Sequence, residues 1–179
     1  MTRLAEQLYS EDIHFLMELI QNADDNDYPE GTDYPFLHFT VQNDGIIIGN
    51  NEQGFSQENI TALCNIGAST KKGNNRKGFI GKKGIGFKSV FRISTAPEIH
   101  SNGFHISFDI GEDGKDKIGY IKPRWLDELR PDVQNLQSNM KTIIRLPYKN
   151  TCTSEDRHRL STEISQIDST LLLFLNTLR

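Results

Sequence analysis

The stretch ELIQNADDN, residues 18–26, forms the polar half of a segment whose first half is apolar. The apolar residues that precede it and run into it recur with helical spacing. This periodicity predicts a helix over residues 12–26 that ends before Pro29 and Gly31. The same helix is therefore expected both to pack against a core and to present an unusual row of carboxylates and carboxamides.

Three polar residues of this helix share one face. At about 100° per residue, Glu18, Asn22 and Asp25 lie within about 60° of one another and away from the apolar face. Such a row is ordinary on a solvated helix. A carboxylate one turn from a carboxamide also suits a water-activating base beside Mg²⁺, because Mg²⁺ binds few protein oxygens and keeps several waters. The helix alone leaves both interpretations open.

Composition limits the class of protein. The chain has 179 residues, a net charge of −4 and 36% hydrophobic residues, which suits one globular domain with a core. No apolar run reaches the roughly 18 residues that a membrane span needs, and no signal peptide opens the chain. The run LLLFL at residues 171–175 is expected to pack a terminal helix. Cys64 and Cys152 lack zinc-site spacing, so we expect a reduced intracellular protein.

Turn and capping signals divide the chain into alternating helices and strands. Hairpin turns are predicted at Asn43-Asp44-Gly45 and at Asn102-Gly103. The predicted helices cover residues 3–9, 12–26, 56–66, 84–92 and a last helix that begins near Thr153; the predicted strands cover residues 36–41, 46–49, 93–100, 104–110, 118–122 and 142–146. Ser56 is expected to cap the helix that it begins, and Thr153-x-x-Asp156 resembles a capping box. Because several strand pairs are hairpins, we expect an α+β fold. It is a two-layer α/β sandwich, with a mixed, mostly antiparallel sheet and helices on one face.

A glycine-rich segment, GKKGIGFKS at residues 81–89, follows a basic loop. Its glycines let the backbone approach an anion, and the predicted helix start supplies free N–H groups. It is not a P-loop, since Phe87 separates Gly86 from Lys88, and Ser89 replaces the last glycine of a dinucleotide fingerprint. We therefore predict an anion site formed with the local basic cluster, which comprises Lys71, Lys72, Arg76, Lys77, Lys82, Lys83 and Lys88.

Five motifs in register resemble the nucleotide-binding domain of the GHKL ATPases, the superfamily of gyrase B, the ninety-kilodalton heat-shock chaperones, histidine kinases and MutL. They are ELIQNADDN, NNEQGFS, IGASTKKG, GKKGIGFKSVF and KTIIRLPY, and they cover roughly residues 12–148. Within the superfamily they are most similar to the chaperone-like domains of the sacsin and NO VEIN type. The resemblance implies a single Bergerat-fold ATP-binding domain over residues 1–179, the N-terminal part of a longer protein.

The resemblance also implies residue roles. Glu18 matches the glutamate that polarises the attacking water, and Asn22 matches the asparagine that coordinates Mg²⁺. Residues 65–81 match a lid that closes over the phosphates. The residues implied to bind ATP or ADP are Asn22, Asp25, Asn50, Gly54, Phe55, Asn65, Ile66, Gly67, Lys71, Gly81, Lys82, Lys83, Gly84, Ile85, Gly86, Phe87, Lys88 and Thr142.

The chain departs from the superfamily pattern at the adenine-reading position. Asn50 stands where an aspartate is typical, and Glu52 stands at a glycine position of the same motif. Asn50 can still accept a hydrogen bond through its amide oxygen, but a charge-assisted bond is roughly twice as strong as a neutral one. We therefore expect weaker nucleotide binding or looser adenine selectivity than in members with aspartate.

The implied activity is ATP hydrolysis, because Glu18 stands where histidine kinases have asparagine. Turnover by these residues alone is expected to be slow, since relatives take a further Lys or Arg from a following domain. A nucleotide-gated protein-binding module without useful turnover is the alternative. A nucleic-acid role for the basic loop is disfavoured, because its basic residues interleave with glycines. Expected partners are a nucleotide and a protein client or second copy, with no membrane, in cytoplasm or nucleus.

Overall fold

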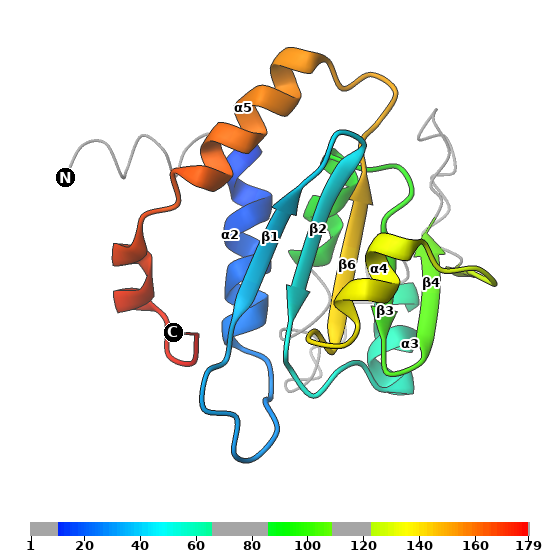
Figure 1. The fold of residues 1–179 in the computed structure, drawn as a ribbon, viewed down its shortest axis with the longest axis vertical. Coiled ribbons are helices and arrows are strands. Elements are labelled where there is room, and N and C mark those ends of the chain that lie inside the picture. The colour runs from blue at the N-terminus through cyan, green and yellow to red at the C-terminus, as the bar shows by residue number, and fades with distance from the viewer. Residues whose placement is uncertain (1–10, 66–85, 109–122, 179) are drawn as a thin grey trace, which may run out of the picture.

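The computed structural model describes residues 11–65, 86–108 and 123–178. Within these ranges six strands form one sheet in the order β1-β2-β6-β3-β4-β5, and every neighbouring pair is antiparallel (Figure 1). The strands are β1 (Leu37–Val41), β2 (Gly45–Asn50), β3 (Glu98–Ser101), β4 (Phe104–Phe108), β5 (Pro123–Trp125) and β6 (Thr142–Pro147). The helices are α2 (Glu11–Asp24), α3 (Gln57–Asn65), α4 (Pro131–Leu136) and α5 (Ser154–Ser165), with 3-10 helices η2 (Gly86–Arg92) and η3 (Ser169–Phe174).

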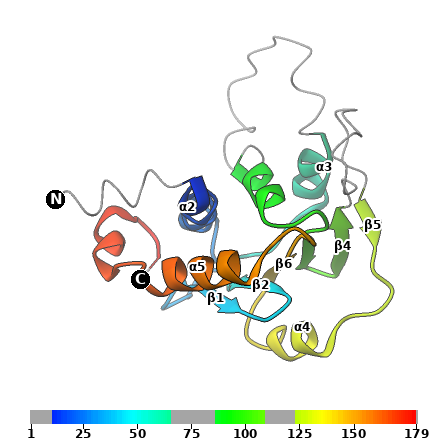
Figure 2. The same cartoon turned by 90° about the horizontal axis from the view of Figure 1, so that it is seen from above.

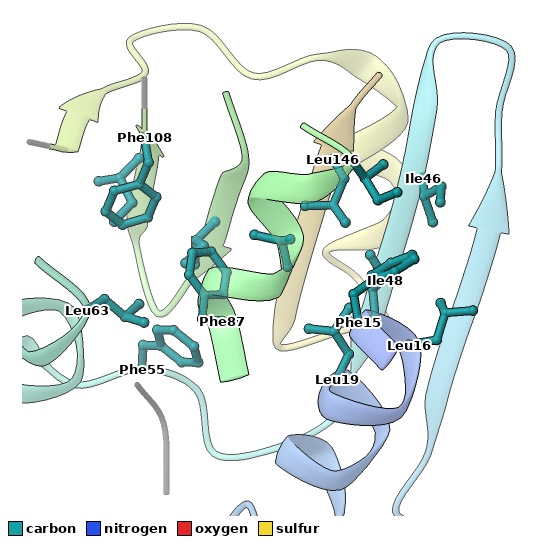
Figure 3. Close-up of a cluster of buried hydrophobic side chains, with 14 of the residues drawn as sticks. Phe15, Leu16, Leu19, Ile46, Ile48, Phe55, Leu63, Phe87, Phe108 and Leu146 are labelled. Atoms are coloured by element: carbon teal, nitrogen blue, oxygen red, sulfur yellow. The ribbon is translucent and has the colours of Figure 1, made fainter. Parts of the chain in front are cut away.

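The principal core lies on one face of the sheet, under α2, α3 and η2. Figure 2 shows these three helices on the same side of the strands. Alternation along β2 turns Ile46 and Ile48 toward this face, where both are buried. They meet Phe15, Leu16 and Leu19 of α2, and the cluster extends through Phe87 to Phe55 and Phe108 (Figure 3). The apolar periodicity of the first helix is thus explained by a core that it covers.

The opposite face of the sheet is covered by α4. Ile47 of β2 and Ile143 of β6 point to this side and form a smaller cluster with Val133 of α4. The expectation of helices on one face only is therefore wrong for α4, which Figure 2 shows below the strands. This helix spans six residues and begins at Pro131, so it is too short to show a helical period in the sequence.

The predicted elements agree with the structure in kind and differ mainly at their ends. The Asn102-Gly103 hairpin is confirmed, with φ of +48° and +81° at the two turn residues. The predicted strand over residues 93–100 is wrong in its first half, since β3 begins only at Glu98. Ile93 still donates to Val90 at the end of η2, and Pro97 has no N–H to donate. The predicted helix 3–9 and strand 118–122 lie outside the described residues.

The structure confirms the predicted N-terminal caps of two helices, α3 and α5. Ser56 Oγ accepts from the N–H of Asn59 at the start of α3. Thr153 and Asp156 form the expected capping box of α5, because each side chain accepts from the backbone N–H of the other. Both caps fix where the chain turns from a loop into a helix.

The C-terminal segment returns to α2. The carboxylate of Asp24, the last residue of α2, accepts hydrogen bonds from the backbone N–H groups of Asn176, Thr177 and Leu178 at 2.7–3.0 Å. Leu178 packs against Ile20 and Ala23 of the same helix. The run LLLFL packs only in part, since Leu172, Leu173 and Phe174 are 44%, 82% and 74% exposed.

Candidate functional site

A small cavity lies between α2, the central strands and the helices α3 and η2. Its volume is about 40 Å³, enough for a water molecule and less than a purine ring system occupies. Its lining residues are Leu19, Asn22, Ala23, Asn26, Leu37, Ile48, Asn50, Glu52, Phe55, Leu63, Phe87, Thr142 and Ile144. The walls are mostly apolar, and a few polar side chains reach them from three separate segments of the chain.

The helix α2 places Asn22 at the cavity and Glu18 one turn away from it. Phe15, Leu16 and Leu19 anchor the helix in the core, so the flank that carries Asn22 borders the cavity. The Glu18 side chain is 36% exposed, and its Oε1 lies 3.9 Å from Nε2 of His14. Glu18 therefore has contact with solvent while Asn22 is half-buried beside the cavity.

Asp24, the last residue of α2, and Asp25, the next residue, have different environments. Asp25 was nominated for the nucleotide, but its side chain is exposed and does not line the cavity. Asp24 is buried and holds the C-terminal segment. Burial alone would raise the pKa of Asp24, but the N–H bonds from Asn176, Thr177 and Leu178 outweigh it and lower the pKa.

A chain of hydroxyl groups connects the central strand β6 to the loop after β2. Ser101 Oγ accepts from the N–H of Phe55 at 2.9 Å and lies 2.7 Å from Oγ1 of Thr142. If Ser101 donates its own proton to Thr142, the Thr142 hydroxyl proton is left for the cavity that Thr142 lines. Antiparallel pairing aligns the two hydroxyl residues, since Ser101 of β3 is the register partner of Thr142.

Gly54 is nominated for the nucleotide and has a structural requirement of its own. Its φ is +89°, a conformation that favours glycine. A Cβ at this position would meet the side-chain amide of Asn102, which donates to the carbonyl oxygens of Gln53 and Phe55. Gly54 thus lets the β3–β4 turn close onto the loop that carries Phe55.

Glu52 is a cavity residue to which the sequence analysis assigned no function. The sequence marked it only as a residue at a glycine position, whereas the structure buries it completely and places it on the cavity wall. Burial, the charge of Glu52 and that of Asp24 raise the pKa of the Tyr28 phenol. Asn26 also lines the cavity and was not nominated; its spacing of four residues from Asn22 was the available signal.

The described structure thus brings together five of the nominated residues and does not place the others at the cavity. Asn22, Asn50, Phe55, Phe87 and Thr142 all line it. Most of the predicted lid and phosphate loop lies outside the described residues, and with it the predicted nucleotide-binding residues Ile66, Gly67, Lys71, Gly81, Lys82, Lys83, Gly84 and Ile85. Gly86 begins η2, while the side chains of Asn65 and Lys88 are not described.

The described ranges contain neither a metal-binding cluster of acidic, histidine or cysteine side chains nor a membrane-spanning helix. No group of three or more His, Cys, Asp or Glu side chains in them is arranged to hold a metal ion. None of the helices in these ranges combines the length and the apolar composition that crossing a membrane requires.

A family profile and two related proteins point to the same family. The family profile described as "Sacsin domain" matches residues 2–118. Protein NO VEIN of Arabidopsis thaliana is 47% identical over 189 residues, which covers 98% of this chain and 7% of that protein. Sacsin of Homo sapiens is 31% identical over 114 residues, covering 56% of this chain and 2% of sacsin. The chain spans less than a tenth of either relative, and it belongs to the Sacsin domain family.

Proposed function

We propose that this domain binds ATP with Mg²⁺ and hydrolyses it slowly, as the nucleotide-binding domain of a chaperone-like ATPase of the GHKL type. One observation carries the proposal. Asn22, Asn50, Phe55, Phe87 and Thr142 come from four motifs of the sequence, and all five line one cavity. A common nucleotide ligand requires these residues to share one cavity, so their shared position supports the proposal.

The cavity suits a nucleobase in its chemistry. Ile48, Phe55 and Phe87 supply apolar walls for a flat ring, and Asn50 and Thr142 supply polar groups to orient it. The volume of about 40 Å³ is too small for the ring as it stands. Binding therefore includes a movement of lining side chains, which is common for residues at a ligand site.

Mg²⁺ would be held through the side-chain oxygen of Asn22 together with nucleotide phosphates and water. This donor set fits Mg²⁺, which takes oxygen ligands and needs few of them from the protein. The ion would supply neutralisation of the phosphate charge. Glu18, which lies one turn along α2 and is in contact with solvent, would accept a proton from a water molecule near Asn22.

The proposed turnover is slow for a chemical reason. Phosphoryl transfer depends on cations that stabilise charge on the transferred group. The described residues at the cavity are asparagines, a threonine, a glutamate and apolar residues, so a Lys or Arg must come from elsewhere. A following domain, as in the ATPases that the sequence resembles, is the expected source.

A second candidate function is a nucleotide-gated module that binds a protein and turns ATP over little or not at all. The observation that favours it is the exposed apolar surface of η3, where Leu173 and Phe174 are 82% and 74% exposed. Such side chains are typical of protein contacts. In this alternative the same cavity binds nucleotide, and Glu18 contributes little.

Calorimetric titration with ADP and with a non-hydrolysable ATP analogue tests the proposal. We expect Mg²⁺-dependent binding that Asn22→Ala reduces at least about tenfold, since a metal ligand is lost. Asn135→Ala, an exposed asparagine of α4 on the opposite face, is the matched control and should bind as the wild type does. Absence of binding at millimolar nucleotide would reject the proposal.

Glu18→Ala separates the two candidate functions. If the domain hydrolyses ATP, this variant should lose phosphate release and keep its affinity for ADP. If wild type and Glu18→Ala release phosphate at the same background rate while both bind, the module without turnover is the correct function.

A further inference from the structure

Two histidines face each other on the side of the sheet opposite the principal core. His100 of β3 and His105 of β4 are register partners, and their neighbours Ile99 and Ile106 point to the core. The Nδ1 atoms of the two rings lie 3.2 Å apart, and His100 is 2% exposed while His105 is half-buried. The contact therefore joins the two strands of the β3–β4 hairpin close to its turn.

The contact between the two Nδ1 atoms can hold one proton. Nε2 of His100 lies 3.4 Å from Oε2 of Glu98, and a carboxylate only accepts, so this nitrogen donates. In the neutral ring, Nδ1 of His100 then carries a lone pair that accepts the N–H of His105 Nδ1. If His100 gains a proton at Nδ1, the other tautomer of His105 can still accept it. When both rings are protonated, two N–H groups and two positive charges face each other, and the hydrogen bond is lost.

The charged groups on this side of the sheet already have partners. They are Glu98 of β3, Arg124 of β5, Asp44 of the β1–β2 turn, Arg145 of β6, and Arg130 and Asp132 at the start of α4. Arg145 donates to Glu98 at 3.0 Å and to Asp44 at 2.7 Å. Arg130 reaches Asp44 and Asp132, each at 3.2 Å. Because each of these carboxylates has an arginine beside it, the group offers little stabilisation to a second protonated ring.

The surroundings therefore oppose the protonation of both rings. Burial, followed by the charge of a protonated His100, lowers the pKa of His105 from its ordinary value of 6.5. A histidine with a lowered folded pKa stabilises fully above its unfolded value, and this stabilisation is lost as pH falls through the folded pKa. The contact thus stabilises the hairpin at about pH 7 and ceases to do so in mild acid.

The hairpin also holds the loop of residues 51–55, which we call the cavity loop. Ser101, next to His100 in β3, accepts from the N–H of Phe55 at 2.9 Å. Asn102 Nδ2, at the turn, donates to two carbonyl oxygens of the cavity loop at 3.0 and 3.2 Å. Phe55 lines the cavity, whose volume of about 40 Å³ admits a nucleobase only if lining groups move. Movement of the hairpin therefore changes access to the cavity.

We propose that the His100–His105 pair is a proton-sensitive latch, which holds the hairpin on the cavity loop at neutral pH and loosens it in mild acid, so that nucleotide enters and leaves the cavity faster. The effect on nucleotide rests on the function proposed above, whereas the latch itself involves only the hairpin and the cavity loop. Exchange through a loosened form is as fast as that form is frequent, so a rise in its population speeds the passage of nucleotide.

Amide hydrogen exchange of Phe55 tests the latch without any nucleotide. Its protection factor, which corrects for the intrinsic effect of pH on exchange, should fall about three- to tenfold from about pH 7.5 to 5.5, as expected for the loss of one hydrogen bond. His105→Gln keeps a donor for His100 and cannot be charged, so its protection should not change with pH. His158→Gln, at an exposed histidine of α5, is the matched control and should behave as the wild type does.

Displacement of a fluorescent ADP by excess unlabelled ADP, in the presence of Mg²⁺, tests the effect on nucleotide. The displacement rate constant should rise between these pH values by the same factor in wild type and in His158→Gln, and His105→Gln should lack this rise. Comparing the three proteins at each pH removes the titration of the nucleotide phosphate, which is common to all of them. A displacement rate that does not follow the protection of Phe55 would overturn the effect on nucleotide.

The outcomes distinguish the latch from the nucleotide function. Failure to bind nucleotide, with Phe55 protection that falls in acid only where His105 is present, would reject the nucleotide function and leave the latch standing. Protection that is independent of pH in wild type, or that falls equally in His105→Gln, would overturn the latch. Nuclear magnetic resonance of the wild-type rings needs no variant to fold: a coupled pair should titrate in two separate steps. Two independent titrations at the ordinary histidine value would overturn the latch too.

Discussion

Replacing Asp24 with asparagine should release the C-terminal segment from α2. The carboxylate accepts from three backbone N–H groups, with Oδ1 at 2.7 Å from Thr177 N and at 3.0 Å from Leu178 N, and Oδ2 at 2.9 Å from Asn176 N. Asparagine has one acceptor oxygen, and its NH₂ group would face N–H donors. The variant keeps the size of the side chain, so its effect reports on charge and hydrogen bonding.

The magnitude follows from the type of bond. A hydrogen bond to a charged group contributes about 1.5–3 kcal/mol and a neutral one about 0.5–1.5 kcal/mol. Relief of the cost of burying a carboxylate offsets part of the loss. We therefore expect a net loss of about 2–3 kcal/mol in the free energy that holds residues 176–178 on α2.

Amide hydrogen exchange measures this local stability directly. Because Leu178 alone of these residues packs as a buried apolar side chain, the segment should open before the domain unfolds. A loss of 2–3 kcal/mol corresponds to about 30- to 150-fold faster exchange at residues 176–178. Asp25→Asn, next along the chain and exposed, is the matched control and should not change this exchange.

The effect should depend on pH with a definite sign. The pKa of Asp24 in the folded protein lies below its ordinary value of 3.8. A group with a lowered folded pKa stabilises fully above its unfolded pKa, and this stabilisation is lost as pH falls through the folded pKa. The difference between wild type and Asp24→Asn should be constant from about pH 7 to 5 and shrink in stronger acid. Equal exchange protection of residues 176–178 in wild type and Asp24→Asn at about pH 7 would refute the role of the Asp24 carboxylate in holding this segment. A difference between the two proteins that persists unchanged in strong acid would refute it too.

Two further substitutions test local structure by urea or thermal unfolding. Gly54→Ala should cost about 2 kcal/mol, because its φ is +89° and its Cβ would meet Asn102, whereas Gly103→Ala at φ +81° has open space and should cost about 1 kcal/mol. Equal costs would contradict the close approach to Asn102. Thr153→Ala should cost about 1 kcal/mol by leaving the N–H of Asp156 without its cap, and Thr153→Ser should retain most of the stability. An unchanged stability in the alanine variant would mean that this cap contributes nothing.

Much of the fold and part of the site could be predicted from local signals. Turn chemistry placed the hairpin at Asn102-Gly103, and the capping box placed the start of α5, because both depend on residues within a few positions. Among the site residues, Asn22 and Thr142 were nominated from motifs, and both line the cavity. Turns, caps and the order of motifs can be predicted because they depend only on residues close together or on linear spacing.

Local sequence signals could not predict which helix covers the second face of the sheet, or which of the two aspartates Asp24 and Asp25 is buried. The position of α4 on the second face depends on Ile47 and Ile143, which alternate with residues that face the main core. Asp24 and Asp25 differ by one helical position, or about 100°. The sequence pattern favoured Asp25, whereas contacts from residues 152–154 positions away bury Asp24.

By itself the sequence determined the types of the elements, their turns and caps, and the membership of the chain in its family, because periodicity and motifs are local or linear properties. Only the tertiary structure decided which side chains are removed from water. Glu52 is polar, follows a strand and lies in a loop, so every local rule predicts exposure. It is buried because α2, the end of β2 and the β3–β4 turn meet around the loop that carries it, and such a meeting is a property of the packed chain.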